Sequence, residues 1–138
     1  MNTLAVASIV IQFIGPCDSN PILNTNLSRR FINVGVASVS TLTEHKIPFE
    51  GSEKGINSVF GTPTGLSALE VISDNEMRSY GWCYSVNNEI PQIFPNQYSL
   101  SSSVSEIKWF YGYAHYLNGE WISQCEPAYK LKPTFLCK

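Results

Sequence analysis

The sequence contains few charged side chains. Asp, Glu, Lys and Arg make up 14% of its 138 residues, and the net charge is −2. A typical soluble protein has ~25% charged residues. No cluster of Lys and Arg is present, and such clusters are what nucleic acids and anionic lipid surfaces attract. The composition therefore gives no reason to expect nucleic acid as a partner, or binding to a charged membrane surface.

The motifs of common cofactor sites and catalytic centres are also missing. No Cys-x-x-Cys pair occurs, and the two histidines, His45 and His115, stand far apart in the chain, so a structural zinc site has no support. No phosphate-binding loop, metal-ligand motif or nucleophile elbow is found. We therefore expect no metal, no other cofactor and no enzymatic activity.

No apolar run reaches the length of about 20 residues that a membrane-spanning helix needs. Residues 4–15 (LAVASIVIQFIG) form the most apolar run, and their length suits the apolar part of a secretory signal. The alternative is a buried first strand, because Ile9, Val10 and Ile11 favour strands. We favour the signal. Residues 1–29 would then be an apolar segment with a linker, and residues 30–138 a single secreted, periplasmic or cell-surface domain with no membrane span after processing.

The chain has four widely spaced cysteines. An even number in a small domain with little charge is typical of disulfides formed in an oxidising compartment. Four cysteines allow three pairings. We favour Cys83 with Cys125, because a hairpin after Leu117 brings them near each other, and Cys17 with Cys137, which joins the two ends of the chain.

Two aromatic segments have the clearest strand pattern. Residues 80–88 (YGWCYSVNN) and 106–116 (EIKWFYGYAHY) place bulky side chains at every second position, as strands with one buried face do. The residues of the expected core face are Trp82, Tyr84, Ile107, Trp109 and Tyr111. Asn118-Gly119 follows the second segment and predicts a tight hairpin.

One helix is expected, and we place it after residue 61. Thr62 is a suitable N-cap, and Pro63 suits the first helical position. An apolar stripe with a spacing of three residues follows, made of Leu66, Leu69 and Ile72. The valine-rich residues 31–42 (FINVGVASVSTL) are expected to form a further strand. The fold class is therefore α+β: a mixed sheet with one helix packed on one face, plus a C-terminal hairpin and tail.

The order of these motifs resembles the transcobalamin-like C-terminal domain family. The matching pieces are residues 62–69 (TPTGLSAL), 82–87 (WCYSVN) and 107–111 (IKWFY). The sequence departs from the family pattern at Asn88, where the family has glycine, and at residues 101–105, where Gly-Asp is usual. The resemblance implies a small β-grasp domain of the kind found in vitamin B12 carriers and bacterial surface proteins. Cobalamin is implied only in company with a large helical domain, which this sequence does not contain.

A single helix cannot cover both faces of a sheet, so some aromatic side chains should remain available for binding. The candidate ligand-binding residues are Phe110, Tyr113, His115, Tyr116 and Trp121. Aromatic residues gathered on one exposed face make a binding surface for a sugar ring, a flat ligand or a protein. The alternative is that the first strand or the tail covers them. We therefore predict a non-enzymatic binding module for a small ligand or an exported protein.

Two other functions stay open. A pair of Cys83 and His115 would make the chain a small exported enzyme, provided that the thiol is reduced and lies within hydrogen-bond reach of the imidazole. A structural module of a surface assembly would bind a partner protein and no small ligand. A free, reactive Cys83 thiol distinguishes the enzyme from both binding functions.

Overall fold

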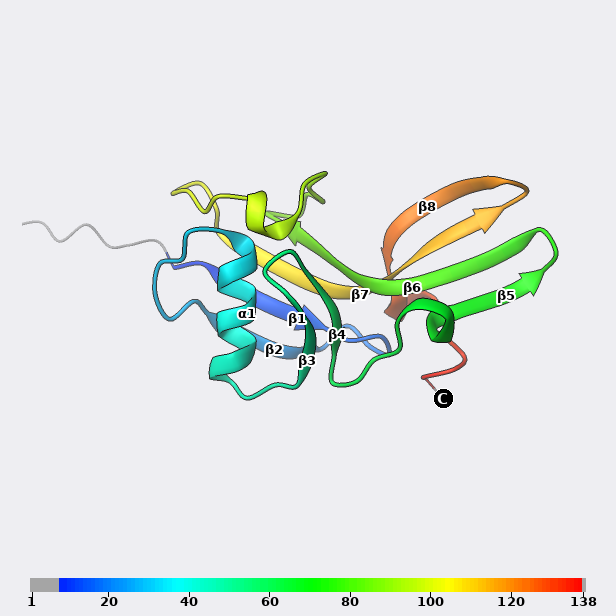
Figure 1. The fold of residues 1–138 in the computed structure, drawn as a ribbon, viewed down its shortest axis with the longest axis horizontal. Coiled ribbons are helices and arrows are strands. Elements are labelled where there is room, and N and C mark those ends of the chain that lie inside the picture. Colours follow the sequence, from blue (N-terminus) through cyan, green and yellow to red (C-terminus); the bar gives the residue numbers. More distant parts are fainter. Residues whose placement is uncertain (1–7, 138) are drawn as a thin grey trace, which may run out of the picture.

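The computed structural model describes residues 8–137, which form one α-helix and two sheets (Figure 1). The strands of the main sheet are β1 (Val10–Ile14), β2 (Pro21–Asn26), β5 (Leu69–Ser73), β6 (Glu76–Val86), β7 (Glu106–Leu117) and β8 (Glu120–Pro127). The small sheet consists of β3 (Phe49–Ser52) and β4 (Gly55–Val59). The helix is α1 (Val34–Glu44), and the three short 3-10 helices are η1 (Gly65–Ala68), η2 (Pro95–Gln97) and η3 (Ala128–Lys130).

The main sheet has the strand order β2-β1-β7-β6-β5. At its centre β1 and β7 run parallel, with Val10 opposite Glu106, and the other pairs in the sheet are antiparallel. β8 pairs with β7 between Gly112 and Leu117. A first hairpin, then a helix, then a parallel return strand at the centre is a β-grasp-like order. The α+β fold class with a mixed sheet and one helix is confirmed.

The α-helix lies at residues 34–44, within the segment that we expected to be a strand. The Asn33 side chain caps it by accepting a hydrogen bond from the backbone N–H of Val36 at 2.8 Å. Its buried residues, Val34, Gly35, Ala37, Ser38, Thr41 and Leu42, recur with helical spacing on one face. The strand prediction for residues 31–42 is therefore wrong. It relied on the content of β-branched residues, which favour strands, whereas the spacing of the buried residues fits a helix.

The segment that we expected to be helical forms η1 and the edge strand β5 instead. The Leu66 side chain is 88% exposed and packs on no sheet. The Thr62 hydroxyl does not cap a helix, since it accepts a hydrogen bond from the indole N–H of Trp82 at 2.8 Å. The helix prediction after residue 61 is therefore wrong. Three apolar residues spaced by three also fit a single 3-10 turn followed by a strand.

The main core lies between α1 and one face of the main sheet, which we call the inner face. Trp109 of β7 lies at its centre, with its indole N–H bonded to the Ser38 hydroxyl of α1 at 2.7 Å. The Tyr84 ring stacks on Trp109 with centroids 5.2 Å apart. Of the residues expected in the core, Tyr84, Ile107 and Trp109 are buried there and Trp82 is half-buried. Tyr111 is buried in a second core cluster, made of Ala68, Tyr80, Tyr111 and Ala128.

The sheet includes residues that we expected to precede the domain. Ile11 and Phe13 of β1 are fully buried in the main core, and β2 occupies most of the expected linker. The described domain thus reaches back to Val10, ahead of the expected boundary at residue 30. For residues 10–14 the structure has the buried strand that was the alternative to a signal. Residues 1–7, the first part of the expected N-terminal segment 1–29, lie outside the described residues.

The structure has two disulfides, Cys17–Cys137 and Cys83–Cys125, with Cα atoms 5.5 and 5.9 Å apart. They are the two pairs that we favoured from the sequence. Cys83–Cys125 passes close to Gly112 of β7. A Cβ atom at Gly112 would lie only 3.3 Å from the Cys83 sulfur and 3.0 Å from a backbone oxygen of β8. Two disulfides fit an oxidising, extracellular environment.

Candidate functional site

One row of apolar side chains crosses four strands on the outer face of the main sheet, opposite to the inner face. Val71 of β5 pairs with Met77 of β6, Met77 with Tyr116 of β7, and Tyr116 with Trp121 of β8. Directly paired residues of neighbouring antiparallel strands point to the same face. We call these four residues the outer row.

The outer row is open to solvent at both ends. Val71 is 73% exposed and Trp121 is 47% exposed, while Met77 and Tyr116 between them are half-buried. The Tyr116 and Trp121 rings meet edge to face with centroids 5.3 Å apart, a preferred arrangement of aromatic pairs. The β7–β8 hairpin holds this pair, and both residues of its turn, Asn118 and Gly119, have positive φ angles, as a tight hairpin requires.

The C-terminal tail packs on the opposite, inner face of the same strands. The Tyr80 hydroxyl donates a hydrogen bond to the carbonyl of Leu131 at 3.0 Å, and the Phe135 ring meets Tyr80 edge-on at 5.5 Å. The backbone N–H of Thr134 bonds the Glu70 carboxylate at 2.7 Å. The tail therefore covers the inner face of β5 and β6, and α1 covers the inner face further along.

The five candidate residues do not form one surface. Tyr116 and Trp121 belong to the outer row. Phe110 also points to the outer face, but it is only 5% exposed and pairs with the disulfide residue Cys83. Tyr113 and His115 lie on the inner face. The Tyr113 ring packs 5.7 Å from Tyr80, so it contributes to the second core cluster.

Two contacts between a basic side chain and a carboxylate lie on the inner face, and His115 makes one of them. The His115 imidazole lies 2.7 Å from the Glu76 carboxylate, and Arg78 lies 2.9 Å from Glu70. Burial disfavours the charged form of Arg78, but the hydrogen bond and the charge of Glu70 outweigh it, so the pKa of Arg78 is raised. These contacts join β5, β6 and β7 across the sheet.

The enzyme alternative depends on a free Cys83 thiol. Cys83 is bonded to Cys125, so its thiol is not free. Its pairing with Phe110 places it on the outer face, whereas the pairing of His115 with Arg78 places the imidazole on the inner face. The Cys83–His115 pair of the enzyme alternative therefore does not form.

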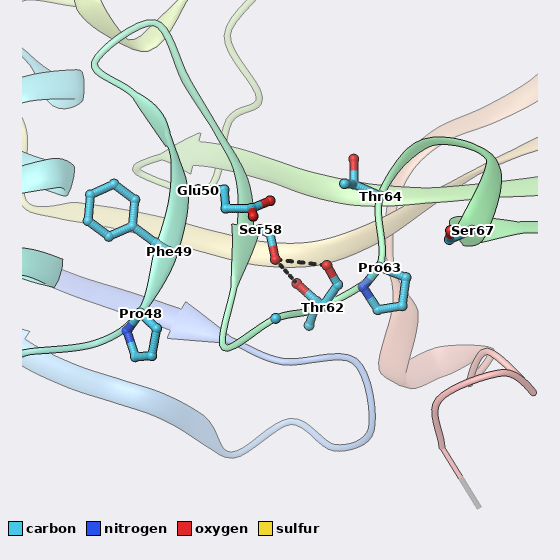
Figure 2. Close-up of a pocket in the computed structure, with 9 residues that line it drawn as sticks. Pro48, Phe49, Glu50, Ser58, Thr62, Pro63, Thr64 and Ser67 are labelled. Atoms are coloured by element: carbon cyan, nitrogen blue, oxygen red, sulfur yellow. Dashed lines mark hydrogen bonds between the residues drawn. The ribbon is translucent and has the colours of Figure 1, made fainter.

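A cavity of about 430 Å³ lies between the β3–β4 hairpin and the segment that follows β4 (Figure 2). Its lining residues are Pro48, Phe49, Glu50, Ser58, Gly61, Thr62, Pro63, Thr64 and Ser67. Thr62 connects this wall to the core through the indole of Trp82, and the carbonyl of Pro63 accepts a hydrogen bond from Tyr111 at 2.7 Å. Burial raises the pKa of Tyr111 above its ordinary value, so this hydroxyl stays a donor.

No protein-family profile matches the chain, and no curated protein matches it. A solved structure of a "putative metal binding protein" from Ruminococcus gnavus is similar at a TM-score of 0.48 and 18% identity, covering 77% of this chain and 98% of that one. A likeness at this level carries no argument about function. Within residues 8–137 no group of three or more His, Cys, Asp or Glu side chains is placed to hold a metal ion. Within the same range, no helix has the length and apolar character to cross a bilayer.

Sequence reasoning did not find Val71, Met77 or the cavity residues. Val71 was assigned to the expected helix, and Met77 precedes the aromatic pattern of β6. Only the pairing register brings Val71 and Met77 into line with Tyr116 and Trp121. The cavity depends on a contact between two loops, for which a sequence pattern carries no signal.

Proposed function

We propose that the chain is an exported, non-enzymatic binding module that uses the outer row to hold a protein partner. The observation that carries this proposal is the register that aligns Val71, Met77, Tyr116 and Trp121 on one open face. Strands in a sheet lie about 4.8 Å apart, so the row extends roughly 14 Å across four strands. An apolar strip with aromatic and methionine anchors has the composition of the centre of a protein interface.

The two disulfides support a setting outside the reducing cytosol, in the secreted, periplasmic or cell-surface space. The β-grasp-like strand order supports the resemblance to the transcobalamin-like C-terminal domain family, whereas the first matching piece, residues 62–69, forms η1 and the start of β5 in place of the expected helix. Members of that family occur as parts of exported proteins, which suits a module that docks on another protein. A structural role in a surface assembly is a form of the same proposal, because it uses the same row on a permanent partner.

Trp121 is the residue whose loss should affect partner binding most. It is aromatic, half-exposed and held in place by Tyr116, as residues that dominate binding energy are. Truncating such a residue costs about 2 kcal/mol or more, which is roughly a thirtyfold loss of affinity. The matched control is Ile90→Ala, because Ile90 is also half-exposed but lies in the β6–β7 loop, away from the outer row.

The test compares immobilised wild-type protein, Trp121→Ala and Ile90→Ala in binding to exported proteins of the same cells. A partner retained by the wild type and by Ile90→Ala, and lost with Trp121→Ala, supports the proposal. A photo-reactive residue at position 116 should then cross-link to that partner. Equal retention by all three proteins would show that the outer row is not the binding surface. Quenching of Trp121 fluorescence by a sugar or a corrinoid, with no protein retained, would assign the row to a small ligand and overturn the proposal.

A further inference from the structure

The cavity between the β3–β4 hairpin and the following segment lies apart from the outer row. Its two sides come from different parts of the chain, with Pro48 and Glu50 on one side and Pro63, Thr64 and Ser67 on the other (Figure 2). Thr62 in its wall bonds Trp82, which belongs to the inner face. The cavity therefore lies on the side of the sheet opposite to the outer row.

Buried hydrogen bonds hold in place the part of the cavity wall formed by Ser58 and Thr62, which we call the floor. The Ser58 hydroxyl donates to the Thr62 carbonyl at 2.8 Å, and the Thr62 hydroxyl accepts from the backbone N–H of Val59 and from the Trp82 indole. Ser58 and Thr62 are buried polar residues. A floor whose polar groups are already paired is rigid, so the cavity exists before a ligand enters, as binding pockets commonly do.

A strained aromatic residue stands next to this floor. Phe60 has a φ angle of +54°, which is uncommon for a bulky side chain and costs roughly 1–2 kcal/mol. Its backbone is fixed there by a hydrogen bond from its N–H to the Pro48 carbonyl at 2.9 Å. The side chain is nevertheless 52% exposed, beside the lining residue Gly61. Strain of this kind is characteristic of ligand-binding segments.

The chemistry of the lining indicates the class of ligand. Pro48 and Pro63 offer apolar surfaces, Thr64 and Ser67 offer exposed hydroxyls, and Glu50 offers an exposed carboxylate. No lysine, arginine or histidine lines the cavity, so a phosphate or a carboxylate would find no cationic partner. Among residues 8–137, Glu50 takes part in no ion pair and can accept hydrogen bonds from a ligand.

We propose that this cavity binds one ring of a neutral sugar. A sugar ring has an apolar face of C–H groups, which suits the two prolines and the Phe49 ring that line the cavity. It also has a rim of hydroxyls, which suits Glu50, Thr64 and Ser67. A volume of about 430 Å³ lies in the ordinary range of small-molecule sites, about 300–1,000 Å³, and accommodates a single ring.

The three tryptophans provide separate reporters for the test. The indole N–H of Trp82 bonds Thr62 in the cavity wall, that of Trp109 is buried against α1, and Trp121 belongs to the outer row. We would titrate the whole chain with neutral methyl glycosides at millimolar concentration and follow the indole and backbone amide signals by NMR. At least one glycoside should shift the Trp82 indole and the Gly61 amide while Trp109 and Trp121 stay unchanged.

Two variants test the assigned contacts. Glu50→Gln keeps the shape but removes the charged acceptor, which should weaken glycoside binding about tenfold. Glu53→Gln is the matched control, since Glu53 is an exposed carboxylate in the turn of the same hairpin that does not line the cavity.

Several outcomes would overturn this assignment. No shift with any glycoside would exclude a sugar site, and a shift confined to Trp121 would transfer the sugar to the outer row. Binding of an alkylammonium salt in place of a glycoside would show that Glu50 selects a cation. Equal weakening by Glu50→Gln and Glu53→Gln would mean that the carboxylate acts only through the general charge of the hairpin. None of these results depends on whether a protein binds the outer row.

Discussion

Removing the Cys83–Cys125 disulfide should destabilise the protein strongly and loosen β8 in particular. The two cysteines are 42 residues apart in sequence, and the chain-entropy relation for a loop of that length gives about 4 kcal/mol. For Cys17–Cys137, with a separation of 120, the same relation gives about 5 kcal/mol, because the dependence on length is logarithmic. Since whole domains are stable by only about 5–15 kcal/mol, either loss is a large fraction of the total.

The assay is urea unfolding of the oxidised wild type beside the double variants Cys83→Ala/Cys125→Ala and Cys17→Ala/Cys137→Ala. Both variants should lose several kcal/mol, with similar losses from the two loops. The pairing of β7 with β8 is interrupted by register shifts, so only the first variant should also increase quenching of Trp121 by iodide. An unchanged unfolding free energy in either variant would refute the loop-entropy reasoning. So would a loss for the shorter loop that clearly exceeds the loss for the longer one.

Three further substitutions test the packing. Gly112→Ala places a methyl group against the disulfide and β8, so the unfolding free energy should fall by about 1–3 kcal/mol, and an unchanged urea midpoint would contradict this packing. Ser38→Ala leaves the buried Trp109 indole without its acceptor, which should cost about 1–3 kcal/mol, whereas Ser40→Ala on the same helix should cost less. Burial raises the pKa of Tyr84 from 10.0 to about 12, so its contribution to stability is complete below pH 10 and is lost as the pH rises towards 12. The alkaline fall in the urea midpoint should therefore be shallower in Tyr84→Phe, and an identical fall would contradict this assignment.

The sequence predicted those parts of the fold in which local pattern and tertiary structure agree. Alternation over residues 80–88 and 106–116 identified β6 and β7, and Asn118-Gly119 identified the hairpin that follows. Successive side chains of a strand point to opposite faces, so the position in the sequence assigns each side chain to a face, and tertiary contacts do not change this. The Cys83–Cys125 pairing followed from the same hairpin, because it brings β8 back alongside β7. The Cys17–Cys137 pairing was the one that remained.

The helix was assigned to the wrong segment for a physical reason. Residues 34–44 are rich in valine, serine and threonine, which have modest helix propensity, and the helix is stabilised by packing and by its Asn33 cap. Gly35 is needed in the helix because a Cβ there would collide with the backbone of Glu53. Contacts of this kind join distant segments and leave no local pattern to read.

The candidate site was predicted only in part for a related reason. The alternation of side chains along a strand places Tyr113 and His115 on one face of β7, and Phe110 and Tyr116 on the other. It does not show that Tyr113 packs against Tyr80 and His115 against Glu76, or that the disulfide lies beside Phe110. Tyr116 and Trp121 were found because both are aromatic, whereas Val71 and Met77 join them only through the pairing of four strands.

The parallel pair at the centre of the sheet determines when this chain is able to fold. Val10 of β1 meets Glu106 of β7, a separation of 106 − 10 = 96 residues. A two-stranded hairpin such as β1–β2 has little stability in water, and contacts between distant parts of a chain form slowly. Until β7 has been synthesised and has left the ribosome, the edge of β1 that pairs with β7 has no partner strand. The main sheet therefore stays incomplete until residues 106–110 have been synthesised.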